Sequence, residues 1–89
     1  ILITRPIHTE GERLVLNAAC GKGGSIEVEV TDAADGMLAG CSRAECDTFS
    51  GDSTRATVTW KGKSGIAHSG PLRLRFFMRN ASLYSFAFE

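Results

Sequence analysis

The chain has 89 residues, of which 43% are hydrophobic and 22% are charged, a composition typical of one small globular domain. This size excludes a multidomain enzyme, and no apolar run reaches the roughly 20 residues that a membrane-spanning helix needs. Ten basic and ten acidic residues give a formal charge of zero, so the chain lacks the strong field that attracts nucleic acid or an anionic membrane.

The start of the chain and its cysteines give two further indications. Because no signal-type leader accompanies Ile1, we expect residues 1–89 to be a single-domain piece of a longer protein. The sequence of this piece does not indicate a cellular location. The odd number of cysteines leaves at least one thiol unpaired. The spacing of Cys41 and Cys46 permits a small loop disulfide, whereas the alternative is that these residues and Cys20 are small buried hydrophobic side chains.

The first third of the chain predicts three strands. Residues 1–8 are rich in β-branched side chains around Pro6, which suits an edge strand because proline cannot donate to a ladder. Residues 13–20 and 25–31 both alternate apolar with polar side chains, with period two. The glycine-rich residues 21–24 between them predict a hairpin. The inward side chains of this hairpin are Leu14, Leu16, Ala18, Cys20, Ile26, Val28 and Val30.

The rest of the chain continues the pattern of strands and turns. Residues 32–36 predict a turn, and residues 40–53 predict a long irregular connection because they show no period. Residues 54–60 alternate again, with Trp60 inward. The strongest alternation lies in 71–79 and 83–88, and the short link between them predicts antiparallel pairing. Tyr84, Phe86 and Phe88 are in phase with apolar neighbours, so we expect core positions for them.

Short strands at regular spacing, with no helical period, predict an all-β fold. We expect an antiparallel, jelly-roll-like β-sandwich of about seven to eight short strands.

Three blocks of the sequence then resemble a known family. They are LVLNAACGKGGSIEVEVTDAADG, DTFSGDSTRATVTWKG and PLRLRFFMRNASLYSFAFE, and the resemblance runs from about residue 12 to residue 88. They resemble the β-sandwich domain at the C-terminal end of bacterial secreted glycoside hydrolases, where it follows a propeller region of the sialidase or family 32 and 43 type. The matching positions are Asn17, Asp35, Gly36, Gly51, Asp52, Trp60, Arg73, Arg75, Leu83, Tyr84, Ser85 and Phe86, and the chain departs from the pattern at Cys41, where an aromatic residue is expected.

The resemblance implies a noncatalytic accessory domain, in a secreted or periplasmic protein, that sits beside a catalytic domain of the same chain. The residues agree with a noncatalytic role. His8 and His68 are the only histidines, and neither belongs to a nucleophile elbow or to a metal-type pair. The cysteines lack the paired Cys-x2-Cys spacing of zinc sites. We therefore expect no catalytic residues and no cofactor.

Four aspartates allow one metal hypothesis. Asp32 and Asp35 lie in one loop region, and Asp47 and Asp52 lie in another. If the two loops meet, their carboxylates can offer oxygen ligands to a structural calcium ion. The alternative is that these aspartates only stabilise turns.

One face of residues 71–79 carries a candidate ligand site. Phe77 shares that face with Arg73, Arg75 and Arg79, which places one aromatic ring among guanidinium groups. Such a face can bind an anionic sugar or a partner surface. The plainer interpretation is a ladder of ion pairs in which Arg73 and Arg75 offset Glu27 and Glu29 on a neighbouring strand, with Phe77 under the arginine stems. We expect carbohydrate binding or packing on the catalytic domain; the alternative is a structural or protein-interaction domain that binds no sugar.

Overall fold

The described strands form an antiparallel sheet. A computed structural model of the chain describes residues 1–9, 11–34, 36–38, 40–66 and 70–89. It contains strands β1 (Leu2–Ile3), β2 (Leu14–Asp32), β3 (Asp52–Thr57) and β4 (Leu72–Phe88), and a short 3-10 helix, η1 (Arg43–Glu45). Within these residues the sheet has the order β1-β4-β2-β3. The predicted all-β, antiparallel class is confirmed, whereas four described strands do not confirm a sandwich of seven to eight.

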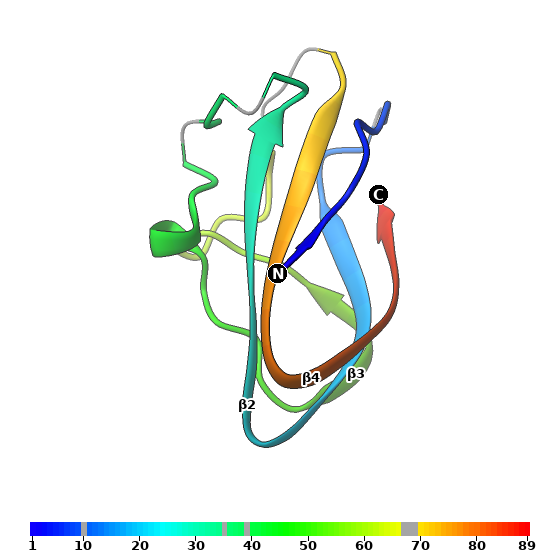
Figure 1. The fold of residues 1–89 in the computed structure, drawn as a ribbon, viewed down its shortest axis with the longest axis vertical. Helices are drawn as coiled ribbons and strands as arrows, with labels where there is room; N and C mark the ends of the chain where they lie inside the picture. Colours follow the sequence, from blue (N-terminus) through cyan, green and yellow to red (C-terminus); the bar gives the residue numbers. More distant parts are fainter. Residues whose placement is uncertain (10, 35, 39, 67–69) are drawn as a thin grey trace.

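The two long strands determine the shape of the molecule. Strands β2 and β4, of 19 and 17 residues, pair with each other along most of their lengths. Both turn back at the bottom of Figure 1, so the two halves of the β2–β4 ladder come to face each other. Phe76 and Phe86, which lie in different halves of β4, meet with their ring centroids 5.5 Å apart. The bend therefore lets a single ladder enclose its own core.

The bend arises where the four residues 21–24 of β2 oppose the single residue Asn80 of β4. Asn80 has φ of 44°, and its side-chain Nδ2 donates a hydrogen bond of 3.1 Å to the carbonyl oxygen of Lys22. A Cβ atom added at Gly24 would lie only 2.3 Å from the carbonyl oxygen of Asn80. Glycine is required there because the two backbones approach so closely.

Both predicted hairpins are wrong. Residues 14–20 and 25–31 belong to one continuous strand, β2, and residues 72–79 and 83–88 belong to β4. The segments pair across the long strands instead of with their sequence neighbours. A glycine-rich link between two alternating runs is common to a hairpin and to a bent strand. The bent arrangement is favoured here because it brings the apolar faces of the two halves together.

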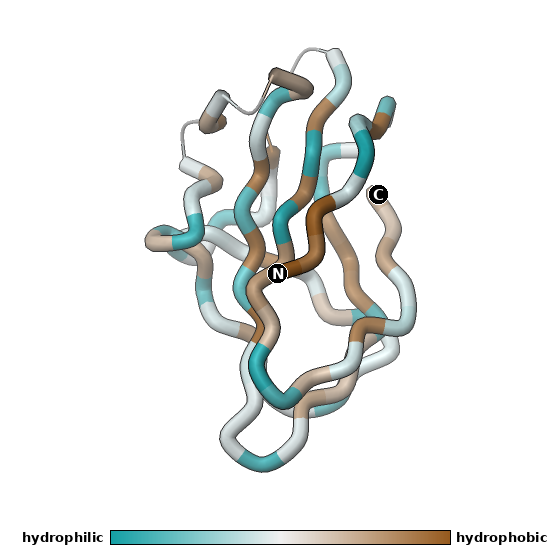
Figure 2. The backbone as a smooth tube through the Cα atoms, in the orientation of Figure 1, coloured by the Kyte–Doolittle hydropathy of each residue, from teal (hydrophilic) through white to brown (hydrophobic). Residues whose placement is uncertain are grey.

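The predicted inward positions are mostly confirmed, and Trp60 is one of them. Its side chain is only 2% exposed, and Nε1 donates a hydrogen bond of 3.0 Å to the carbonyl oxygen of Val28. Alternating apolar and polar residues are visible along the long strands in Figure 2. The buried core consists of Leu14, Leu16, Ala18, Ile26, Val28, Val30, Cys41, Cys46, Val58, Trp60, Ile66, Leu72, Leu74 and Phe76.

Tyr84 departs from its predicted core position because of a β-bulge. Asn17 pairs with Ser85 and Ala18 pairs with Leu83, so Tyr84 is an extra residue on β4. A bulge reverses the alternation of side chains beyond it. Tyr84 is therefore 68% exposed, whereas Leu83 packs against the core. Phe86 and Phe88 lie on the other side of the bulge. Both are partly buried and pack against the core, which confirms the inward direction predicted for them.

The start of the chain forms an edge of the sheet, as predicted. Leu2 and Ile3 of β1 pair with Phe76 and Arg75 of β4, and Ile7 forms an isolated bridge with Leu72. The side chains of β1 are exposed, and this apolar segment is conspicuous in Figure 2. Among the described residues, no helix has the length and apolar character needed to cross a membrane.

Candidate functional site

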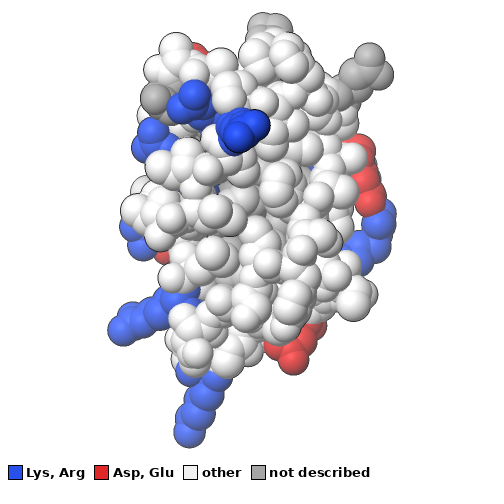
Figure 3. Space-filling model, turned by 45° about the vertical axis from the view of Figure 1, so that its right-hand side comes forward, with Lys and Arg blue, Asp and Glu red and all other residues white. Residues whose placement is uncertain are grey.

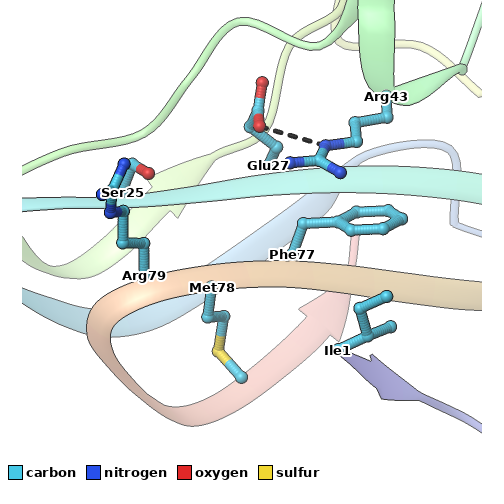
Figure 4. Close-up of a pocket in the computed structure, with 7 residues that line it drawn as sticks. All are labelled: Ile1, Ser25, Glu27, Arg43, Phe77, Met78 and Arg79. Carbon is cyan, nitrogen blue, oxygen red and sulfur yellow. Dashed lines mark hydrogen bonds and ion pairs between the residues drawn. The ribbon is translucent and has the colours of Figure 1, made fainter.

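A groove lies on the outer face of the β2–β4 ladder, beside η1 and the first residue (Figure 4). Its volume of about 320 Å³ is at the lower end of the range for small-molecule sites, and it is open to solvent. The lining residues are Ile1, Ser25, Glu27, Arg43, Phe77, Met78 and Arg79. Phe77 and Arg79 are two of the four residues for which the sequence predicts ligand binding.

The register of the ladder brings most of these groups together. Ile26 and Val28 point into the core, so Ser25 and Glu27 point outward from β2. Directly opposite them on β4 are Arg79, which faces Ser25, and Phe77, which faces Glu27. Side chains at such directly opposed positions are in contact range.

Arg43 completes the groove from η1. Its Nε donates a hydrogen bond of 3.2 Å to Glu27 Oε1, and its Cζ lies 4.1 Å from the centroid of the Phe77 ring. The guanidinium thus covers one face of the ring, as Figure 4 shows. Thr48 Oγ1 donates to the other oxygen of Glu27, at 3.4 Å. Glu27 is therefore held between Arg43 and Thr48.

Helix η1 is fixed at its start by Ser42. The Ser42 hydroxyl accepts a hydrogen bond of 3.3 Å from the backbone N–H of Glu45 and donates one of 2.8 Å to Glu45 Oε1. This reciprocal pair resembles a capping box, which stabilises the first turn of a helix. The turn projects Arg43 over Phe77. The sequence gives no signal for this contact, because residues 40–53 show no period.

The predicted ladder of ion pairs is confirmed at one rung. Arg75 Nη1 lies 3.5 Å from Glu29 Oε1, its cross-strand partner. Glu27 pairs with Arg43 rather than with an arginine of β4, because the register puts Phe77 opposite Glu27. Arg73 faces Thr31, and neither Arg73 nor Arg75 lines the groove. Phe77 does not lie under the stems of the β4 arginines, as the sequence predicted; the ring lies under the guanidinium of Arg43, which comes from η1.

The aspartates of the calcium hypothesis do not all lie together. Asp32 ends β2 at the far end from the bend, whereas Asp52 pairs with Ala19 close to the bend (Figure 1). Asp32 Oδ1 accepts hydrogen bonds of 2.8 Å from the N–H groups of Ala34 and Gly36, an aspartate turn. Asp35 lies outside the described residues.

Asp47 stabilises a different loop. Its Oδ2 accepts hydrogen bonds from the Thr59 hydroxyl at 2.6 Å and from the Gly62 N–H at 2.7 Å. These two bonds lower the pKa of Asp47 because they favour the ionised carboxylate. Within the described ranges, His, Cys, Asp and Glu form no group of three or more that could hold a metal ion. The calcium site stays a prediction.

All three cysteines are free thiols in the structure. Cys41 and Cys46 are buried in the core, and Cys46 Sγ accepts a hydrogen bond of 3.3 Å from the N–H of Val28. Burial raises the pKa of both thiols. This agrees with the alternative of small buried hydrophobic side chains for these two residues, whereas Cys20 is half-buried. His8 is exposed, and His68 lies outside the described residues.

Comparisons with protein-family models, with curated proteins and with solved structures found no match to this chain.

Proposed function

We propose that this domain is a noncatalytic accessory module of a secreted carbohydrate-active enzyme, and that the groove binds a saccharide. The observation that carries the proposal is the composition of the groove: an aromatic ring, two guanidinium groups, a carboxylate and a hydroxyl line one open cavity of about 320 Å³. Saccharides are recognised by such a mixture, because they present both C–H faces and hydroxyl groups. The resemblance of three sequence blocks to accessory domains of bacterial glycoside hydrolases supports the same function. We propose a jelly-roll-like β-sandwich as the fold of the domain.

The proposal is tested by titrating the domain with a panel of oligosaccharides and following its backbone amide NMR signals. Signals of Ser25, Phe77 and Arg79 are expected to shift, and Phe77→Leu is expected to weaken binding by about fivefold or more. Tyr84→Ala is the matched control, because Tyr84 is an exposed aromatic residue outside the groove. If no saccharide shifts these signals, or if only Tyr84→Ala weakens binding, the groove is not a saccharide site.

The noncatalytic part of the proposal has its own test. The domain is incubated with chromogenic glycosides, and release of the chromophore is measured against a buffer blank. No release above the blank is expected. Hydrolysis by these 89 residues alone would contradict the proposal.

A second candidate function, packing against another protein domain, is favoured by an apolar surface. Ile1 is 82% exposed, and Leu2 and Ile3 of the edge strand β1 are 46% and 52% exposed. The middle of the face in Figure 3 carries almost no charged side chains. An exposed apolar surface of this kind is typical of a protein interface. The partner we propose is the catalytic domain of the same protein. If the domain binds no saccharide, this apolar surface becomes the proposed functional surface.

A further inference from the structure

We propose that the groove selects acidic saccharides, in which a uronic-acid carboxylate is bound by Arg43 and Arg79. The inference rests on the proposed function, because it names the class of saccharide that the same groove binds. It is carried by the position of Arg43, by the charge of the groove and by its apolar walls.

The position of Arg43 disfavours stacking of a neutral sugar on the face of Phe77 that the guanidinium covers. A neutral pyranose stacks its C–H face on an aromatic face. Here the Arg43 guanidinium covers a face of Phe77, with Cζ 4.1 Å from the ring centroid. A sugar that stacked on that face would have to displace the cation and break its ion pair with Glu27. An acidic sugar can instead bind to the cation where it lies.

Arg43 is oriented for this role. Its hydrogen bond to Glu27 uses Nε, which is one of the five N–H donors of a guanidinium. The edge formed by the two terminal nitrogens is not used by this bond and can bind a carboxylate through two parallel hydrogen bonds. Stacking on Phe77 and pairing with Glu27 restrict the side chain before a ligand arrives. The entropy lost on binding is smaller for a side chain that is already ordered.

Arg79 gives the groove its excess positive charge. The charged side chains that line the groove are Arg43, Arg79 and Glu27, which sum to one net positive charge. Glu27 is neutralised by Arg43, whereas Arg79 is exposed and forms no ion pair within the described part of the chain. In Figure 4 the Arg79 side chain extends from β4 across to Ser25, so its charge lies at the rim of the cavity.

The apolar walls favour a sugar acid over a simple anion. Besides the charged groups, the apolar side chains of the groove are those of Phe77 and Ile1, because Met78, although it borders the groove, pairs with Ile26 and packs against the core. Inorganic phosphate has no surface to place against these side chains. A uronic acid has an apolar ring face, hydroxyl groups and a carboxylate, and each has a counterpart in the groove.

The test compares uronate oligosaccharides with their methyl esters, which keep the sugar ring and remove the charge. Oligomers of galacturonate, glucuronate and mannuronate are titrated into the domain by calorimetry at low ionic strength. The acid form is expected to bind about two- to fivefold more tightly than its ester, the effect of an exposed ion pair. This preference is expected to shrink as salt is added, because salt screens exposed charges.

Two variants localise the effect. Arg79→Gln is expected to remove most of the preference for the acid over the ester. Arg13→Gln makes the same change of charge at an exposed residue outside the groove and is expected to leave the preference intact. Both sites are exposed, so both variants are expected to fold, and circular dichroism checks this.

The possible results separate the two proposals. Equal binding of acids and esters, weakened alike by Phe77→Leu, would overturn the acidic ligand and leave the saccharide site in place. Equal effects of Arg13→Gln and Arg79→Gln would also overturn it, because the selectivity would then come from the overall charge. No binding by any acidic or neutral saccharide would overturn both proposals.

Discussion

The bend in β2 can be tested by adding one methyl group at Gly24. The new Cβ would lie 2.3 Å from the carbonyl oxygen of Asn80 and 2.9 Å from those of Arg79 and Gly21. The first distance is about 1 Å short of ordinary van der Waals contact. All three contacts are with backbone atoms, which cannot turn aside as a side chain can. We therefore expect Gly24→Ala to destabilise the fold by about 3 kcal/mol or more, the upper end for an overpacked site.

A loss of this size is large for the whole domain. A chain of this length is typically stable by about 4–13 kcal/mol. A change of about 3 kcal/mol corresponds to a fall in Tm of roughly 12 °C or more. Thermal and urea unfolding, followed by the fluorescence of Trp60, measure it, because this side chain is buried in the folded state.

Gly23→Ala is the matched control, one residue away. Gly23 has φ of 73°, and an added Cβ would meet nothing within 4 Å. Its cost is expected to be the conformational penalty alone, about 1–2 kcal/mol. If Gly24→Ala were as stable as the parent, or less damaging than Gly23→Ala, the close approach of β2 to Asn80 would be wrong.

Three further predictions follow from buried and hydrogen-bonded groups. Because Trp60 is buried, its emission is expected to be blue-shifted in the native domain and to shift red on unfolding; solvent-exposed emission in native buffer would contradict the strand phase. The hydrogen bonds that lower the pKa of Asp47 stabilise the fold above the unfolded pKa of about 3.9, and this contribution is lost as the pH falls through the lower, folded pKa. Asp47→Asn is expected to reduce the acid dependence of Tm below about pH 5, and identical profiles would argue against it. The buried thiols of Cys41 and Cys46, with raised pKa values, are expected to react slowly with an aromatic disulfide reagent until the domain unfolds; rapid reaction of all three cysteines in the native state would disprove their burial.

The inward faces of the strands could be predicted from sequence because side-chain direction is a local property. Successive side chains in a strand alternate between two faces, so the apolar set Ile26, Val28 and Val30 identifies its own buried face. The choice of pairing partner is not local. It depended on whether residues 21–24 form a hairpin or a bend, and that is decided by Asn80, more than fifty residues away.

Only some residues of the candidate site could be predicted from the sequence, for the same reason. Phe77 and Arg79 share an outward face that alternation alone reveals, so both could be named from the sequence. Arg43 could not, because an irregular segment gives no indication of which strand it covers. The position of the Arg43 side chain depends on η1, which carries it, and on Glu27 of β2, which binds its guanidinium. The sequence therefore predicted part of the lining of the groove but not the cation that covers the ring.

The bend and the groove depend on the same register. Ser25 and Arg79, which face each other at the rim, are the first paired residues beyond the bend. A slip of one residue in this pairing would exchange the outward and inward faces of one strand and separate Arg79 from Ser25. Asn80 opposite residues 21–24 fixes that pairing, so the bend both encloses the core and aligns the groups proposed to bind the ligand. A substitution at Gly24 is therefore expected to weaken ligand binding even in the fraction of molecules that remain folded, whereas Gly23→Ala is not.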